Sequence, residues 1–130
     1  KYIENIDIFA KSLRRREGLS KNFKFKNFTN KPTLLKRKYD LIINASNAGM
    51  SHGNKINRNI LRLVKNTKGV IDIVYNPLET DLLKEAEKHN IKSIGGLIML
   101  VEQAKPSFEI WSKKDIEIDD KIYRSLISKI

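Results

Sequence analysis

The chain has 130 residues, of which 40% are apolar and 32% charged, and its formal net charge is +11. This length allows one domain with its own core, and the composition is typical of a folded protein rather than a disordered one. The absence of cysteine excludes disulfides and thiolate metal sites, and no apolar run approaches the roughly 20 residues of a membrane span. We therefore expect a soluble, cytoplasmic protein.

The first third of the chain predicts a strand, a helix and a second strand. Residues 3–9 include the β-branched Ile6 and Ile8, which favour a strand. Ser12 can cap a helix that continues to about residue 23. Residues 24–28 are predicted to form a short strand at an exposed sheet edge, where their lysines would discourage the addition of another strand. Pro32 marks a loop.

Strands and helices continue to alternate after this loop. The run YDLIIN at residues 39–44 is continuously apolar in the manner of a buried parallel strand. Helical spacing or a capping residue predicts helices at 57–64 and 80–90, the latter capped by Thr80. A buried strand is predicted at 70–74 and a short last strand at 91–94.

A longer helix is predicted after the glycine pair at positions 95 and 96. Its apolar residues recur at helical spacing and predict a face packed in the core: Leu97, Leu100, Val101, Ala104 and Phe108. Gly96, Met99 and Gln103 lie on a neighbouring face. A C-terminal amphipathic helix is predicted at 119–128, with Ile122, Leu126 and Ile127 facing inward.

This alternation predicts an α/β fold with a doubly wound parallel sheet and helices on both faces. Such sheets bind ligands beyond the carboxyl ends of their strands. The loops that follow the predicted strands hold the most unusual residues of the chain, so we expect a single site there. These loops begin at Ala10, at Ala45, at Tyr75 and at Gly95.

The first of these loops indicates which dinucleotide would bind. Domains that prefer NAD usually have an acidic residue after the second strand, where it binds the ribose 2′-hydroxyl. Here that position is Ala10, followed by Lys11 and, one helical turn later, Arg15. Cations beside the amides of a helix N-terminus suit a 2′-phosphate and favour NADP. A solvated basic helix face explains these residues about as well when they are taken alone.

Four segments together resemble the cofactor-binding domain of shikimate dehydrogenases. Residues 10–15 (AKSLRR) are similar to that family's Asn-Arg-Thr-x-x-Arg, with Ala10 in place of Asn. DLIINASNAGM at 40–50 and DIVYNPLETDLL at 72–83 are similar to two further family segments. GLIMLVEQA at 96–104 is similar to Gly-Leu-x-Met-Leu-Val-x-Gln-Ala. The resemblance implies a Rossmann-like fold, in which this chain lacks the first strand.

The resemblance also implies a set of binding residues. Lys11, Ser12 and Arg15 would hold the 2′-phosphate of NADP, while Tyr75 and Gln103 would hydrogen-bond the substrate, shikimate or 3-dehydroshikimate. Ile73 and Gly96 would contact the nicotinamide portion through the backbone, Gly96 lacking a side chain so that the ring can approach. Simpler interpretations stay open, with Tyr75 as a core aromatic and Ser46 as a turn residue. The complete cofactor set is Ala10, Lys11, Ser12, Arg14, Arg15, Asn44, Ala45, Ser46, Met50, Ile73, Gly96 and Met99.

The family's Gly-rich turn and its catalytic Lys and Asp would precede this chain, so no catalytic residue is predicted within it. A missing central strand would leave two buried strands with unpaired amides. We therefore expect the C-terminal part of a longer enzyme with an upstream substrate domain, or a truncated copy that needs a partner segment. Residues 1–111 would form the NADP-binding domain, with a C-terminal helix in 112–130 packed on it.

Several other patterns carry less weight. Residues 27–32 only echo the family's Asn-x-Thr-x-Pro-x-Lys, since the spacing is one residue too long. His52 and His89 have no acid or nucleophile at a recognisable spacing, and no cluster of metal ligands is visible. A quinate-using enzyme is the nearest alternative. A nucleic-acid-binding module with Phe23, Phe25 and Phe28 among lysines is disfavoured, because the positive charge is scattered.

Overall fold

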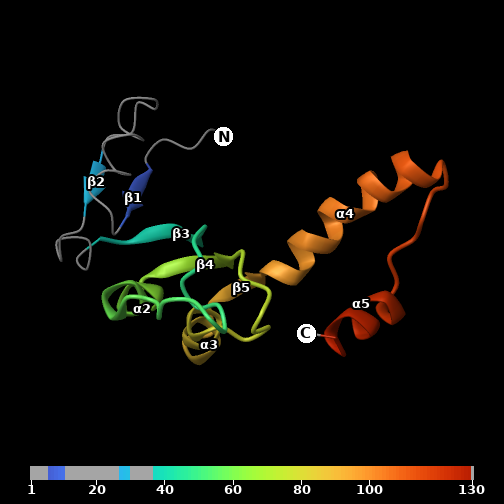
Figure 1. Cartoon of the computed structure of the whole chain (residues 1–130). Coiled ribbons are helices and arrows are strands. Elements are labelled where there is room, and N and C mark those ends of the chain that lie inside the picture. The colour runs from blue at the N-terminus through green and yellow to red at the C-terminus, as the bar shows by residue number, and fades with distance from the viewer. Residues whose placement is uncertain (1–5, 11–26, 30–36, 130) are drawn as a thin grey trace. The chain divides into compact units, whose positions relative to one another are not determined.

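The computed structural model describes residues 6–10, 27–29 and 37–129 (Figure 1). The chain divides into two compact units, residues 1–36 and residues 37–130. In the first unit, β1 (Asp7–Phe9) and β2 (Asn27–Thr29) pair in parallel, with Ile8 opposite Phe28. Both lie at or beside predicted strands. The predicted helix at 12–23 lies outside the described residues.

The second unit contains a parallel sheet of three strands, in the order β3 (Tyr39–Asn44), β4 (Thr67–Asp72) and β5 (Lys92–Gly95). This confirms the parallel α/β fold predicted from the apolar runs. The prediction placed the middle strand at 70–74, and these bounds are wrong. The strand pairs with β3 from Thr67 to Asp72, and the amide of Val74 turns to donate to the Asp72 side chain instead.

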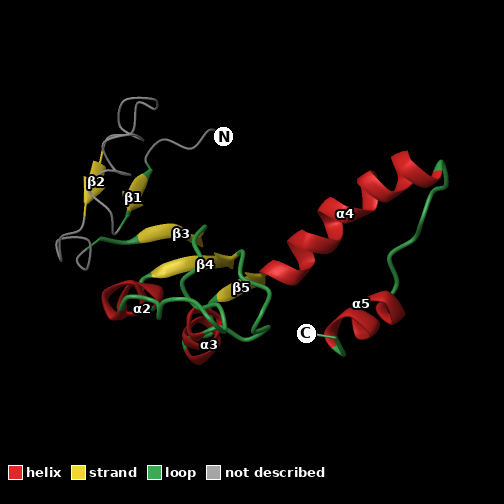
Figure 2. Ribbon diagram, in the orientation of Figure 1, coloured by secondary structure: helices red, strands yellow, loops and turns green. Residues whose placement is uncertain are grey.

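Four helices complete this unit: α2 (Arg58–Val64), α3 (Asp81–Lys88), α4 (Gly96–Ser112) and α5 (Asp120–Ile127) (Figure 2). Three of them begin after a side-chain cap. Asn57 accepts from the amide of Asn59, Thr80 accepts from Leu83, and Asp119 accepts from Ile122. Each cap satisfies an amide that would otherwise lack a partner in the first helical turn.

The core of the second unit lies on one face of the sheet, where α2 and α3 pack (Figure 1). Its buried members are Ile56, Val64, Val70, Leu82 and Ala86. Because side chains alternate along a strand, Ile42 packs against this core while Leu41 and Ile43 point to the opposite face. That face is apolar but open among the described residues, with Ile43 56% exposed and Ile94 48% exposed.

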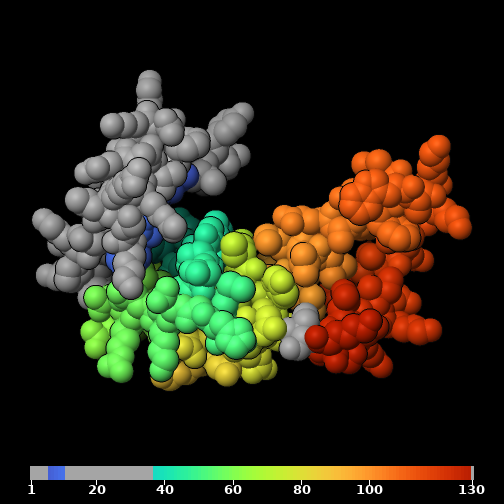
Figure 3. Space-filling view, viewed as in Figure 1, coloured from blue at the N-terminus to red at the C-terminus, as the bar shows by residue number. Residues whose placement is uncertain are grey.

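The predicted core face of α4 is confirmed at two of its five positions. Leu97 and Val101 are buried, whereas Leu100 is 39% exposed and Phe108 48% exposed. Ala104 is also exposed. The prediction was wrong for these three positions. The helix packs beside β5 at its start and then extends away from the sheet, so its later turns lie beyond the sheet (Figures 1 and 3).

The C-terminal helix α5 begins one residue after the predicted start. None of its residues is buried. Ile122 and Leu126 are half-buried, while Ile127 is 46% exposed, so the predicted inward face is covered only in part.

Candidate functional site

The carboxyl ends of the three strands in the second unit form one rim. Asn44 at the end of β3 lies opposite Asp72 at the end of β4, and Asp72 lies opposite Gly95 at the end of β5. The loop after β3, the loop after β4 and the start of α4 therefore leave the sheet at the same edge. This confirms that three of the four predicted loops share one rim.

A buried carboxylate lies at the centre of this rim. Asp72 is fully buried, and its Oδ1 accepts hydrogen bonds from Asn44 Nδ2 at 2.8 Å and from the amide of Val74 at 3.1 Å. Its Oδ2 accepts from Thr80 Oγ1 at 2.6 Å. Burying a carboxylate is costly unless donors surround it, and here three donors do so.

The same network orders the loop after β3. Asn44 Nδ2 donates to the carbonyl of Ala48 at 2.9 Å as well as to Asp72. Asn44 Oδ1 accepts from Ser46 Oγ at 2.7 Å and from the Ser46 amide at 3.2 Å, and Ser46 Oγ accepts from the amide of Ala48 at 3.2 Å. Ser46 is thus a turn residue whichever further role it has, while Ala45 and Ser46 remain exposed on the rim.

A second link joins the loops after β3 and β4. Ser51 Oγ donates to Asn76 Oδ1 at 2.8 Å, and the Ser51 amide donates to the Asn76 carbonyl at 3.2 Å. Asn76 precedes Pro77 across a cis peptide bond. The two loops are therefore held together by both side-chain and backbone contacts.

Gly96 lies where α4 starts against the loop after β4. Its amide donates to the carbonyl of Val74 at 3.2 Å. A Cβ atom at this position would lie 2.1 Å from the carbonyl oxygen of Ile73, which no side chain tolerates. The sequence suggested that the glycine leaves room for a cofactor ring. The structure gives a different reason for the missing side chain, namely the close approach of the chain's own backbone.

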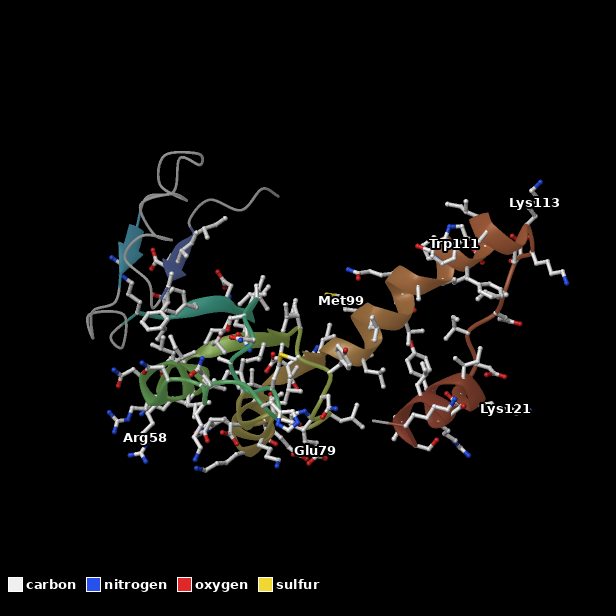
Figure 4. All side chains as sticks on the ribbon, viewed as in Figure 1. Arg58, Glu79, Met99, Trp111, Lys113 and Lys121 are labelled. Carbon is white, nitrogen blue, oxygen red and sulfur yellow. The ribbon has the colours of Figure 1, made fainter. Side chains whose placement is uncertain are left out.

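The other predicted residues of this unit lie in the loops of the rim or on α4. Tyr75 is 41% exposed in the loop after β4, and Met50 is 41% exposed in the loop after β3. Met99 is half-buried in the first turn of α4 (Figure 4). Gln103 lies one turn farther along the helix and is exposed. Tyr75 is therefore not the core aromatic that the simpler interpretation allowed.

The residues predicted to hold the 2′-phosphate belong to the first unit. Ala10 follows β1 and is half-buried. Lys11, Ser12, Arg14 and Arg15 lie outside the described residues, and so do Phe23 and Phe25 of the nucleic-acid alternative. Their roles stay predictions.

Among the described residues, a side chain with a shifted pKa lies away from the rim. Near the starts of β3 and β4, Lys68 Nζ lies 2.6 Å from Asp40 Oδ1, and this hydrogen bond with the charge of Asp40 raises the pKa of Lys68. In the described parts of the chain, no group of three or more acidic or histidine side chains is arranged to hold a metal ion. No helix there is long and apolar enough to cross a membrane.

Comparison with known proteins identifies relatives of the whole chain. A shikimate dehydrogenase (NADP+) of Methanococcus maripaludis is 37% identical over 97% of this chain. The chain is homologous to shikimate dehydrogenases. It spans 48% of the length of that relative. No family model matches the sequence.

Solved shikimate dehydrogenases have the same fold as this chain. A chorismate mutase/shikimate 5-dehydrogenase fusion protein from Clostridium acetobutylicum aligns with a TM-score of 0.71 and 30% identity, over 97% of this chain and 45% of its own. A shikimate dehydrogenase solved in complex with NADP+ aligns with a TM-score of 0.64 and 28% identity, over 96% of this chain and 46% of its own. These matches confirm the Rossmann-like fold and the resemblance stated from the motifs.

The sequence did not single out Asp72 or Asn76 as residues that organise the rim. A polar residue inside the apolar run VIDIV was the available signal for Asp72. The role of Asp72 depends on the strand register that places it opposite Asn44. The sequence does not show that register.

Proposed function

We propose that this chain is the NADP-binding half of an oxidoreductase that reversibly reduces 3-dehydroshikimate to shikimate. The observation that carries the proposal is the 37% identity to a shikimate dehydrogenase (NADP+) across 97% of the chain. The rim geometry supports it, since open α/β sheets bind dinucleotides beyond the carboxyl ends of their strands. The chain spans about half of its relatives, so the remainder of the active site would come from a substrate domain upstream.

The described rim suits a dinucleotide. Ala45 and Ser46 are small and exposed, so a flat ligand can approach the backbone there. We assign Asn44, Ala45, Ser46 and Met50 to the wall of the cofactor site, and Ile73, Gly96 and Met99 to the nicotinamide end. NADPH, when bound, supplies the hydride. Lys11, Ser12, Arg14 and Arg15 beside Ala10 would bind its 2′-phosphate.

The substrate contacts are assigned to Tyr75 and Gln103. Both side chains are exposed in the described structure, so a phenol hydroxyl and an amide are available to a polyhydroxylated ring. The general acid or base of the reaction is assigned to the upstream domain.

A chimera tests the proposed function. This chain would replace the matching 48% of the Methanococcus maripaludis relative, and the purified chimera would be assayed for shikimate-dependent reduction of NADP+. We expect activity with shikimate, more with NADP+ than with NAD+, and quinate in place of shikimate tests the nearest alternative substrate. A folded chimera that binds no NADPH would contradict the proposal.

We further infer that the enzyme acts in the cytoplasm, in the synthesis of chorismate and aromatic amino acids. The supporting evidence is the homology to shikimate dehydrogenases together with a cysteine-free sequence. We also propose that residues 1–111 act as the NADP-binding domain, with the C-terminal helix in 112–130 packed on it. Limited proteolysis with and without NADPH tests that boundary, since a bound cofactor would protect residues 1–111 as one piece.

A further inference from the structure

We infer that Asp72 is a positioning residue of the cofactor site, acting through Asn44 on the loop at residues 45–48. The inference rests on the proposed NADP-binding function and extends it to a residue that would not itself touch the cofactor. Asp72 is fully buried under the rim, whereas Ala45 and Ser46 are exposed on it. Its effect would pass through two hydrogen-bonded side chains.

The first step is the orientation of Asn44. A side-chain amide has a donor end and an acceptor end of nearly the same shape, so its neighbours decide which way it points. Asp72 Oδ1 and the Ala48 carbonyl are both acceptors, and they take the two hydrogens of Asn44 Nδ2. Asn44 Oδ1 must then face Ser46, whose hydroxyl and amide both donate to it.

The second step is the shape of the loop. With its own hydrogen donated to Asn44, Ser46 Oγ is left as an acceptor for the amide of Ala48 at 3.2 Å. Residues 44, 46 and 48 are thereby joined in a closed set of hydrogen bonds, which turns the exposed Ala45 and Ser46 outward over the rim. Removing the acceptor at Asp72 would allow Asn44 to flip and would open this set.

The other oxygen of the carboxylate has a separate task. Thr80 Oγ1 donates to Asp72 Oδ2 at 2.6 Å and accepts from the amide of Leu83 at 3.2 Å, so it fixes the start of α3. This hydrogen bond supports the core, because Leu82 in the same helix is fully buried. The positioning arm therefore runs from Oδ1 to Asn44, and the structural arm runs from Oδ2 to Thr80. Substitutions can distinguish the two.

The test measures NADPH affinity and thermal stability on the chimera described above, with this chain unchanged (the wild type) or carrying one substitution. Asp72→Ala removes both arms, Thr80→Val removes only the structural arm, and Val70→Ala is a matched loss of core packing in the same strand. We expect Asp72→Ala to weaken NADPH binding about tenfold or more, since it frees a hydrogen-bonded loop. Thr80→Val and Val70→Ala should lower Tm. When NADPH affinity is measured well below the Tm of each variant, these two should lose much less affinity than Asp72→Ala.

Hydrogen exchange supplies a readout that general destabilisation would not reproduce. The amide of Ala48 should exchange faster in Asp72→Ala than in Val70→Ala, when both are measured at equal distance below Tm. Asp72→Asn keeps a weaker, neutral acceptor for Asn44, so its affinity should fall between those of the wild type and Asp72→Ala. If Asp72→Ala does not fold, Asp72→Asn against Thr80→Val decides in its place.

The outcomes separate this inference from the proposed function. A folded wild-type chimera that binds no NADPH contradicts the proposed function itself. A wild-type chimera that binds NADPH, with Asp72→Ala no weaker than Val70→Ala or with Asp72→Asn no weaker than Thr80→Val, overturns the positioning role alone.

Discussion

Gly96 shows how one residue can fix the junction between a strand and a helix. The backbone of Ile73 fills the space where its side chain would be, and its amide is bonded to Val74. Gly96→Ala would force a Cβ atom to within 2.1 Å of the Ile73 carbonyl oxygen. We expect a loss of roughly 2–3 kcal/mol in the free energy of unfolding, because neither backbone can move without shifting α4 or β4. Urea denaturation measures it.

Gly69 supplies the matched control for this substitution. A Cβ atom there would lie 3.3 Å from Leu41 Cδ1, the far end of a flexible side chain. Gly69→Ala should therefore change stability by no more than about 0.5 kcal/mol, and the gain in strand propensity offsets the contact. If the two alanine variants were equally stable, the close approach at Gly96 would not be the reason for that glycine.

For single residues, the sequence predicted which positions matter better than it predicted what each one does. Asn44, Ser46 and Gly96 were all singled out, because they belong to recognisable segments after apolar strands. Their contacts could not be foreseen, since Asn44 meets Asp72 across 28 residues of chain and only through the register of β3 with β4. A spacing pattern holds no information about such a partner.

The two faces of β3 give a prediction at the scale of an element. Ile42 packs against the core under α2 and α3, and Ile43 lies 56% exposed on the other face. Ile42→Thr should lower the free energy of unfolding by about 2 kcal/mol, through lost packing and a buried hydroxyl. Ile43→Thr should change it by less than about 0.5 kcal/mol, because threonine suits a strand and the site is open.

The pair of substitutions is its own control, since the same residue type changes at adjacent positions of one strand. Denaturant melts of both variants give the difference directly. Equal and large losses would mean that the face carrying Leu41, Ile43 and Ile94 is covered in solution by another part of the molecule, and the open face would then be contradicted.

Elements were predicted well where a pattern is local. The strand at 39–44 was predicted with its observed bounds, and α3 follows the predicted cap Thr80. The helices α2 and α5 begin one residue after their predicted starts. The middle strand was misplaced because its bounds depend on pairing. The later turns of α4 were wrongly assigned to the core, because periodicity reports which face is apolar and not whether anything packs on it.

At the scale of the whole molecule, the two units differ in what the structure describes. The motifs of the second unit lie in described residues, whereas the cations predicted to bind the 2′-phosphate belong to the first unit and lie outside the described residues. The preference for NADP over NAD therefore still rests on the sequence and on the homology. The two cofactors differ only by the 2′-phosphate, so a comparison of their affinities tests this preference directly.

Removal of two positive charges tests that preference. The double variant Lys11→Gln with Arg15→Gln should weaken NADPH binding by about a hundredfold or more and leave NADH binding nearly unchanged, since each charge-assisted hydrogen bond to a phosphate contributes about 1.5–3 kcal/mol. Titration calorimetry at two salt concentrations measures both affinities. Lys121→Gln with Arg124→Gln on α5 removes the same net charge from exposed positions and controls for the general potential of a +11 chain. An equal loss of NADPH and NADH affinity in the first variant would refute the phosphate assignment, and an equal effect of the two double variants would reduce it to net charge alone.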